Sequence, residues 1–358
     1  MRKVSLLAVA IMGLTTGCGI SGSSSGRLQT NGEVRYRTLS VNAGGGYFGG
    51  LAWPPGGWIF VAHSSGAPGA LPEVGRFRPD GSGFAILTLP IDPGCTRTYY
   101  AGFGVLHDGR LAIGKVCQAP AGVSPSASYA VIAYDPASAR AEQILPLQHK
   151  FAPGPVSFDH SDERAVTAPG SSICVTVAYL TQQGVEPIPA VIKESNPQWR
   201  LDDYFRTQSG SDCSQTARAD GPDWSPDGRQ IAFFGFPKAI GVKGSARLDV
   251  PGNLYLLDPA TLQVRALLHD VQYPSGARWS PDGRWLAFSA MDVPDVGRGT
   301  WLLSVETGKL FRVSNRDLTD VAWAPDGTQL VGLWDNGKNL YPPQTELDLF
   351  DVRSITHT

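Results

Sequence analysis

The chain alternates short apolar segments with turns, and one such unit recurs. Residues 224–235 read Trp-Ser-Pro-Asp-Gly followed by a mainly apolar run. The same order recurs at Trp279, 55 residues further along, and again at Trp323, another 44 residues on, where Ala replaces Ser. Pro and Asp favour a tight turn, and Gly adopts a backbone conformation that other residues resist. Apolar or alternating runs of this length are typical of buried strands.

Each copy is followed by a second strand pair, so one unit contains four strands. Weaker copies precede the three clear ones, and the units begin near residues 50, 102, 155, 221, 276 and 320. Four strands repeated at this spacing are typical of a propeller blade. The pattern therefore predicts an all-β fold, a six-bladed β-propeller of four-stranded antiparallel blades.

The two ends of the repeat array predict how the ring closes. The last unit ends after 346–352 without an outer strand, whereas residues 34–41 form a strand-like segment that belongs to no unit. We expect this N-terminal strand to complete the last blade, because an open terminal blade would expose an edge prone to aggregation.

These units resemble the TolB-like family of Pro-Asp-Gly propeller repeats, over roughly residues 34–355. The resemblance implies a propeller in the bacterial envelope, of a kind commonly used to bind other proteins. The same repeat also forms the propeller half of prolyl-oligopeptidase-like enzymes, which combine it with a hydrolase domain.

Within the repeats we expect structural roles, with the aromatic residues packing between blades and Asp and Gly forming the turns. These residues are Trp53, Trp224, Asp227, Gly228, Trp279, Asp282, Gly283, Trp323, Asp326 and Gly327.

Composition and the N-terminal segment add a location. Gly and Pro make up about a fifth of the chain, 42 and 28 of 358 residues, as a turn-rich fold requires. Residues 1–17 read as a signal peptide, with Arg2 and Lys3 before an apolar stretch. The segment ending in Cys18 resembles a bacterial lipobox, which implies acylation of this cysteine and a membrane anchor. We expect a flexible tether at 18–33 and the propeller at 34–358.

Charge and cysteine usage agree with an exported protein. The net charge is −2, and removing residues 1–17 makes the chain more acidic by two charges. Nucleic acids and anionic membrane surfaces are therefore poor candidate partners. Beyond Cys18, four cysteines remain, an even number typical of disulfides in an oxidising compartment. Three pairings are possible, and we favour Cys95–Cys117 with Cys174–Cys213, since each closes a local loop.

No catalytic motif stands out, and we expect no cofactor and no metal. Gly22 to Gly26 match a nucleophile-elbow pattern but lie in the Ser/Gly tether. The loops that join second to third strands, together with the insert after the third unit, carry aromatic and charged residues, as recognition surfaces do. Candidate binding residues in these segments and nearby are His63, His269, Trp199, Tyr204, Lys238, Arg247, Asp292, Arg298, Trp334, Asp335 and Tyr341.

The sequence therefore favours a lipid-anchored propeller, facing the periplasm or the cell exterior, that binds or scaffolds another envelope protein. Two alternatives remain open. One is an enzyme at the mouth of the propeller channel, such as a polysaccharide lyase or a sugar or lactone hydrolase. The other is a carbohydrate-binding surface in which Trp199, Tyr204 and Tyr341 stack on sugars. An enzyme would show ionisable side chains converging at the channel mouth.

Overall fold

The computed structural model of the protein is built almost entirely of strands. The described part contains 25 strands and one short helix, α1 (Arg353–Thr356). Within it, no helix is long and apolar enough to cross a membrane. The described residues are 29–31, 34–67, 70–91, 93–120, 122, 127–148, 156–159, 161, 165–167, 178–181, 184–187, 218–236, 251–335 and 345–357.

Five antiparallel four-stranded blades follow one another along the chain. Blade 1 contains β3 (Tyr47–Ala52), β4 (Ile59–Ser64), β5 (Glu73–Phe77) and β6 (Ala85–Ile86). Blade 2 contains β7 (Arg97–Val105), β8 (Leu111–Gln118), β9 (Ala127–Asp135) and β10 (Arg140–Gln148). Blade 3 contains β11 (Val156–Phe158), β12 (Ala165–Thr167), β13 (Ala178–Thr181) and β14 (Gly184–Pro187). Blade 4 contains β15 (Arg218–Trp224), β16 (Ile231–Phe236), β17 (Gly252–Asp258) and β18 (Gln263–Val271). Blade 5 contains β19 (Arg278–Trp279), β20 (Trp285–Ala290), β21 (Gly299–Ser304) and β22 (Leu310–Ser314).

A five-stranded sheet completes the ring, and we call it the closing sheet. It contains β23 (Asp320–Trp323), β24 (Gln329–Asp335) and β25 (Thr345–Asp351), followed by β2 (Val34–Leu39) and β1 (Gln29–Asn31) from the start of the chain. The expectation of six four-stranded blades is corrected here: five blades have four strands, and the closing sheet has five because β1 adds outside β2. Residues 29–31, which we assigned to the tether, therefore form a strand.

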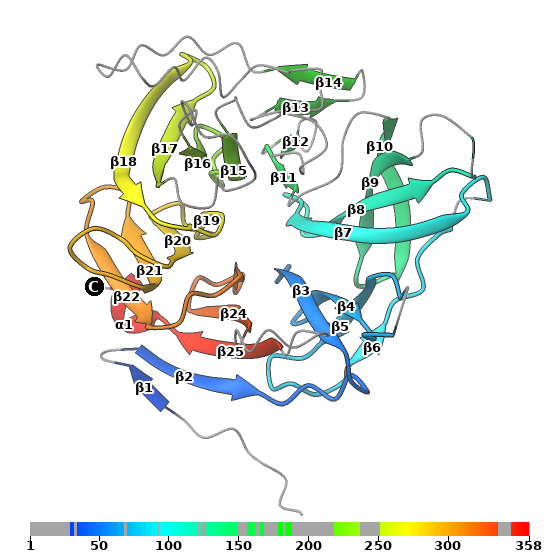
Figure 1. The fold of residues 1–358 in the computed structure, drawn as a ribbon, viewed down its shortest axis with the longest axis horizontal. Coiled ribbons are helices and arrows are strands. Elements are labelled where there is room, and N and C mark those ends of the chain that lie inside the picture. The colour runs from blue at the N-terminus through cyan, green and yellow to red at the C-terminus, as the bar shows by residue number, and fades with distance from the viewer. Residues whose placement is uncertain are drawn as a thin grey trace, which may run out of the picture.

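The first strand of every sheet faces the centre of the ring (Figure 1). Each first strand contacts the first strand of the next sheet, and β23 contacts β3 in turn. The sheets therefore form a closed β-propeller, and the Trp-x-Pro-Asp-Gly pattern predicts the end of each inner strand correctly in its clearest copies.

The predicted N-terminal closing strand is confirmed. β2 pairs with β25 in antiparallel register from Arg35↔Asp351 to Leu39↔Leu347. A buried polar contact supports this pairing, because the hydroxyl of Thr38 donates to Oδ1 of Asp348 at 2.7 Å. Asp348 is fully buried, and its Oδ2 accepts from Arg316 at 2.9 Å. The pairing fastens the first described residues of the chain to the last.

Apolar side chains fill the spaces between neighbouring sheets. Phe234 and Phe288 meet between blades 4 and 5, with ring centroids 5.6 Å apart. Phe60 of blade 1 meets Tyr134 of blade 2 at 6.1 Å. Burying one such side chain stabilises the fold by about 1.5 to 3 kcal/mol. Because these residues lie between sheets, the core stabilises the ring and not isolated blades.

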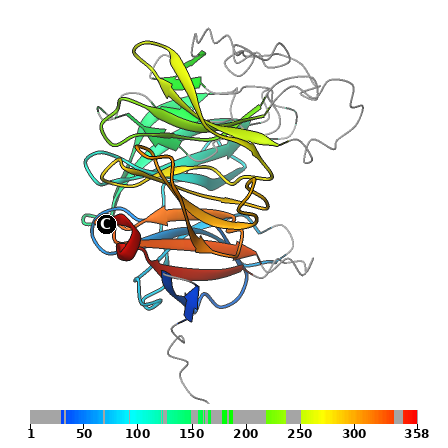
Figure 2. The same ribbon diagram turned by 90° about the vertical axis from the view of Figure 1, so that its left-hand side faces the viewer.

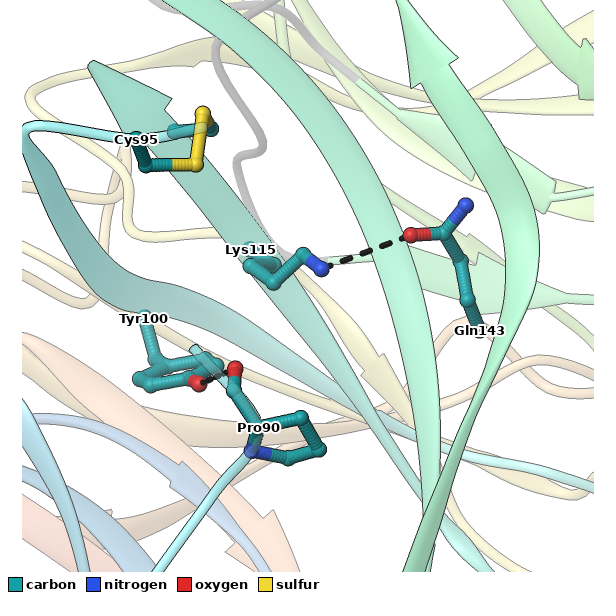
Figure 3. Close-up of a disulfide and its surroundings, with 6 residues drawn as sticks. Pro90, Cys95, Tyr100, Lys115 and Gln143 are labelled. Atoms are coloured by element: carbon teal, nitrogen blue, oxygen red, sulfur yellow. Dashed lines mark hydrogen bonds between the residues drawn. A yellow bond between two sulfur atoms is a disulfide. The ribbon is translucent and has the colours of Figure 1, made fainter. Parts of the chain in front are cut away.

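A disulfide fixes the chain where it enters blade 2. Cys95 and Cys117, 22 residues apart, are bonded, as we expected. Figure 3 shows the bond near two further contacts: the Tyr100 hydroxyl donates to the Pro90 carbonyl at 2.6 Å, and the buried Lys115 donates to Gln143 at 3.4 Å. The second expected pair, Cys174 and Cys213, lies outside the described residues.

Candidate binding site at the channel mouth

The Pro-Asp-Gly turns cover one face of the ring, which we call the turn face. In blade 4, Gly228 N donates to the Ser225 carbonyl at 2.9 Å, and Oδ1 of Asp227 accepts from the Ser225 hydroxyl at 2.6 Å. The φ angles of Gly228, Gly283 and Gly327 are 68°, 70° and 70°, in the left-handed region that favours glycine. Asp282 accepts from Ser280, and Asp326 from Thr328, in equivalent turns.

The aromatic residue before each turn packs against a neighbouring sheet. Trp53, Trp224, Trp279 and Trp323 are all buried. Trp279 belongs to the core between blades 4 and 5, and Trp323 to the core between blade 5 and the closing sheet. The indole Nε1 atoms of Trp279 and Trp323 donate to carbonyls of the preceding blade, Trp279 to Asp223 at 3.1 Å and Trp323 to Arg278 at 3.1 Å.

A chain of hydrogen bonds links the inner strands around the channel. Trp224 N donates to the Ser157 hydroxyl at 2.9 Å, which joins blade 4 to blade 3. Trp279 N donates to Oδ2 of Asp223 at 2.8 Å, which joins blade 5 to blade 4. Leu51 N donates to Oδ2 of Asp320 at 2.8 Å, which joins blade 1 to the closing sheet. Side chains on inner strands thus hold neighbouring sheets together.

Three charged groups lie within this chain of contacts. The Arg278 guanidinium lies 3.4 Å from Asp320, and the two side chains are 15% and 17% exposed. Burial raises the pKa of Asp223 and of Asp320, and the positive charge of Arg278 acts in the opposite direction on both. One guanidinium therefore serves two carboxylates, which also repel each other. Their oxygens accept backbone N–H groups, so their main task is to hold the sheets.

A cavity of about 400 Å³ opens at the turn face, where the inner strands end. Every sheet contributes to its wall, and the charged residues that line it include Asp159, Asp223 and Arg278. This volume falls within the range of pockets that bind ligands or short segments of a partner. The cavity lies at the end of the channel opposite the loops in which we expected the binding site.

An apolar ring of exposed side chains surrounds the cavity, and we call it the apolar collar. It consists of Pro55, Val105, Pro226, Pro281 and Pro325. The prolines belong to the turns, where a fixed φ and the missing N–H are suited to position i+1. Charged turn residues lie outside the collar and pair locally, for example Arg284 with Asp282 at 2.7 Å and Arg110 with Asp108 at 2.6 Å. An apolar centre with a polar rim is the usual anatomy of a protein interface.

Two of the ionisable side chains that line the cavity, His107 and Asp159, come from adjacent blades. His107 is exposed in the first turn of blade 2, whereas Asp159 follows β11 of blade 3 and is buried. The Ser161 hydroxyl donates to Oδ1 of Asp159 at 2.9 Å. Among the described residues, no three His, Cys, Asp or Glu side chains gather as a metal site would require.

None of the predicted binding residues that the structure describes lines this cavity. His63 is buried in blade 1, where its Nε2 lies 2.9 Å from the Gly45 carbonyl and its ring packs against Phe48 and Phe84. His269 is exposed on β18, the outermost strand of blade 4. Both histidines therefore belong to strands outside the inner ring, and not to loops that could face the central opening.

Other predicted residues lie on the face that carries the segments between second and third strands, which we call the loop face. Arg298 pairs with Asp317. Asp292 is exposed, and its backbone forms an isolated antiparallel bridge with Gln272. Trp334 lies 3.9 Å from the Arg316 guanidinium, and Asp335 ends β24. Five candidates lie outside the described residues: Trp199, Tyr204, Lys238, Arg247 and Tyr341.

Sequence reasoning missed the residues that link the sheets and shape the mouth. Ser157, Asp223 and Arg278 each precede the aromatic residue of their repeat, and this shared position was the available signal. The prolines of the collar were visible as turn residues. Their common exposure around one opening depends on the ring and is not written in any single repeat.

No protein-family model and no curated protein matches the chain. Among solved structures it is similar to TolB from Acinetobacter baumannii, with a TM-score of 0.51 and 13% identity over 83% of this chain and 65% of that one. It thus spans about two thirds of that TolB chain. A second structure, an oligogalacturonate lyase in complex with manganese, has a TM-score of 0.45 and 13% identity over 84% of this chain and 75% of the lyase chain. A putative TolB from Agrobacterium tumefaciens has a TM-score of 0.43 and 13% identity over 73% of this chain and 77% of that one.

At such identities the likeness to TolB shows the fold alone. The class of protein is therefore an all-β propeller with TolB-like structural neighbours.

Proposed function

We propose that the protein is an exported, lipid-anchored β-propeller that binds another protein through the apolar collar. The carrying observation is the 400 Å³ cavity with its collar of exposed prolines and Val105. Proline rings are rigid, so little conformational entropy is lost when a partner covers them. The surrounding Asp–Arg pairs supply a polar rim that disfavours non-specific association.

The location rests on the N-terminal segment and the disulfide. A positive n-region, an apolar stretch and Cys18 support export and acylation. The Cys95–Cys117 bond supports an oxidising compartment, since disulfides persist there. Mass spectrometry of the N-terminal peptide tests the anchor: the mature protein should begin at Cys18 with an acyl mass, and Cys18→Ala should abolish it.

Site-directed crosslinking in intact cells tests the binding surface. A photoreactive residue at Pro226 or at Pro325 should capture the same partner, because both positions lie on the collar. Met291, which is 46% exposed on the loop face, is the matched control and should not capture it. With the purified partner, Val105→Glu should weaken binding at least tenfold, while Met291→Glu should leave it unchanged. Equal effects at both positions would exclude the turn face.

The alternative enzyme function has one observation in its favour, the presence of His107 and Asp159 in the same cavity wall. A histidine and a carboxylate are groups that acid–base chemistry uses. Incubation with acidic and neutral oligosaccharides tests this alternative. Product formation that is lost in His107→Ala would replace the binding proposal with an enzymatic one.

A further inference from the structure

Two arginines of blade 1 lie against one tryptophan at the end of the turn that joins β3 to β4. The guanidinium carbons of Arg76 and Arg78 lie 4.4 and 3.6 Å from the ring centroid of Trp58. The strand register explains this arrangement. β4 and β5 pair Phe60 with Arg76, and continuing this register by two residues places Trp58 opposite Arg78. Stacking on an aromatic face fixes the plane of a guanidinium and leaves its edges free for further N–H donation. Nη1 of Arg78 donates to the Gly57 carbonyl at 3.2 Å, so this guanidinium offers an anion its other N–H groups.

A third arginine reaches this place from the closing sheet. Arg37 lies on β2, and its Nη2 donates to the carbonyl of Pro79, next to Arg78, at 3.1 Å. We call Trp58, Arg37, Arg76 and Arg78 the Arg–Trp cluster. Arg37 and Trp58 lie far from Arg76 and Arg78 in the sequence, so no basic run predicts the whole cluster.

The positive charges of the cluster are not neutralised locally. Within the described part of the chain, none of its three arginines forms an ion pair, whereas arginines elsewhere in the ring do, such as Arg110. The acid beside them is Asp80. Its pKa is lowered chiefly by hydrogen bonds from Ser82, and Arg37 adds a smaller effect in the same direction. Three cations beside one exposed carboxylate form an electropositive patch on a chain whose net charge is −2.

The position of the cluster relates it to the start of the chain. Figure 2 shows the ring from the side, with the blue strand β1 at the outer edge of the closing sheet. β1 pairs with β2, the strand that carries Arg37. Eleven positions separate Cys18 from Gln29, and a fully extended chain of that length reaches at most about 40 Å. An acylated Cys18 would therefore hold this edge of the ring close to the bilayer surface.

We propose, against the expectation from the net charge of the whole chain, that the Arg–Trp cluster binds the anionic phospholipid headgroups of the bilayer that holds Cys18, and so orients the propeller on it. The proposal rests on the lipid anchor of the proposed function. Guanidinium groups bind phosphate through paired N–H donors, and tryptophan is favoured at membrane interfaces. Each arginine near an anionic surface increases partitioning about fivefold.

Vesicle co-sedimentation of the full chain carrying Cys18→Ala tests the cluster without an acyl chain. We expect at least tenfold stronger binding to vesicles of phosphatidylcholine with 30% phosphatidylglycerol than to phosphatidylcholine alone, and loss of this preference in 0.5 M salt. Arg76→Gln with Arg78→Gln should reduce binding to the anionic vesicles at least fivefold. Arg140→Gln with Arg265→Gln removes the same charge from exposed strand positions and should have no such effect.

A third arginine variant and an acidic glycan distinguish the proposal from its alternatives. Arg37→Gln lies outside the tryptophan stack and should reduce binding about fivefold even if the double variant unfolds, as judged by circular dichroism. Equal binding by the cluster variants and the Arg140/Arg265 variant would overturn the proposal. Arginine-dependent binding of polygalacturonate without any binding to vesicles would also overturn it, in favour of an acidic glycan. Acylation of Cys18 is measured separately by mass spectrometry, so a missing anchor and an inactive cluster are distinguishable.

Discussion

Asp320 provides the sharpest test of how the ring is held together. Its carboxylate accepts hydrogen bonds from Leu51 N at 2.8 Å and Val321 N at 2.9 Å, and it pairs with Arg278 at 3.4 Å. These partners lie in blade 1, the closing sheet and blade 5. Asp320→Ala therefore removes one group that connects three sheets, at the point where the ring closes.

The structure sets the size of the expected loss. A buried N–H left without an acceptor costs about 1 to 3 kcal/mol. Removing one partner of a buried ion pair costs about 3 to 5 kcal/mol. The two costs overlap, because the same carboxylate supplies both contacts, so we expect a total of about 3 to 5 kcal/mol for Asp320→Ala. Asp320→Asn keeps one acceptor oxygen and should cost about 1 to 2 kcal/mol.

Guanidinium unfolding followed by tryptophan fluorescence and circular dichroism measures these differences, provided that the two transitions coincide. Asp326→Ala is the matched control, because Asp326 lies in the same sheet but is exposed and, among the described residues, accepts hydrogen bonds from Thr328 alone. We expect it to cost about 1 kcal/mol. If Asp320→Ala costs no more than Asp326→Ala, the hydrogen bonds around the channel do not hold the sheets together.

The pH dependence of the Asn variant tests the sign of the electrostatic effect. Because burial raises the pKa of Asp320 above its ordinary value of 3.8, the folded protein binds this proton more readily than the unfolded chain. The stabilisation that results is complete below pH 3.8 and is lost as the pH rises through the folded-state pKa. The deficit of Asp320→Asn relative to the native protein should therefore be larger at pH 4 than at pH 7. A larger deficit at pH 7 would mean that the pairing with Arg278 outweighs burial.

Three further perturbations test other parts of the ring. Reduction of Cys95–Cys117, which closes a loop of 22 residues, should lower stability by about 3 kcal/mol, measured as a lower unfolding midpoint with reductant; an unchanged midpoint would show that the bond constrains nothing. Asp282→Ala should cost about 1 kcal/mol at pH 7. Burial raises the pKa of Asp282, but hydrogen bonds from Ser280 and Arg284 lower it below 3.8. The stability difference between Asp282→Ala and the native protein should therefore become smaller when unfolding is measured at a pH below 3.8. Deleting residues 1–39 removes β1 and β2 and exposes the edge of β25, so size-exclusion chromatography should show self-association, and a stable monomer would contradict the closure argument.

The repeated turn made most of the fold predictable from the sequence. Trp279 and Trp323 mark the ends of inner strands, and the strand at 34–39 completes the last sheet as expected. The strand β1 was not predicted, because Gln29–Asn31 is a short polar segment whose only signal is its pairing with β2. Local sequence patterns report strands that bury apolar side chains, and this strand does not present such a pattern.

The candidate site was less predictable because it is a property of the ring. Asp223, Arg278 and Asp320 are far apart in the sequence, and each belongs to a different sheet. They meet because closure brings the inner strands together around one channel. The same holds for Arg37, which joins Arg76 and Arg78 only when β2 completes the sheet next to blade 1.

Closure of the ring is therefore a structural link between the two proposed surfaces. The collar needs every sheet in place, because each contributes to the cavity wall. The Arg–Trp cluster needs β2 on β25, since Arg37 comes from that strand. Deletion of residues 1–39 removes β2 and with it Arg37, so it should abolish vesicle binding by the cluster, whereas Val105→Glu should affect only the collar and Arg76→Gln with Arg78→Gln only the cluster. Loss of partner binding in the arginine variant would show that the two surfaces are one site.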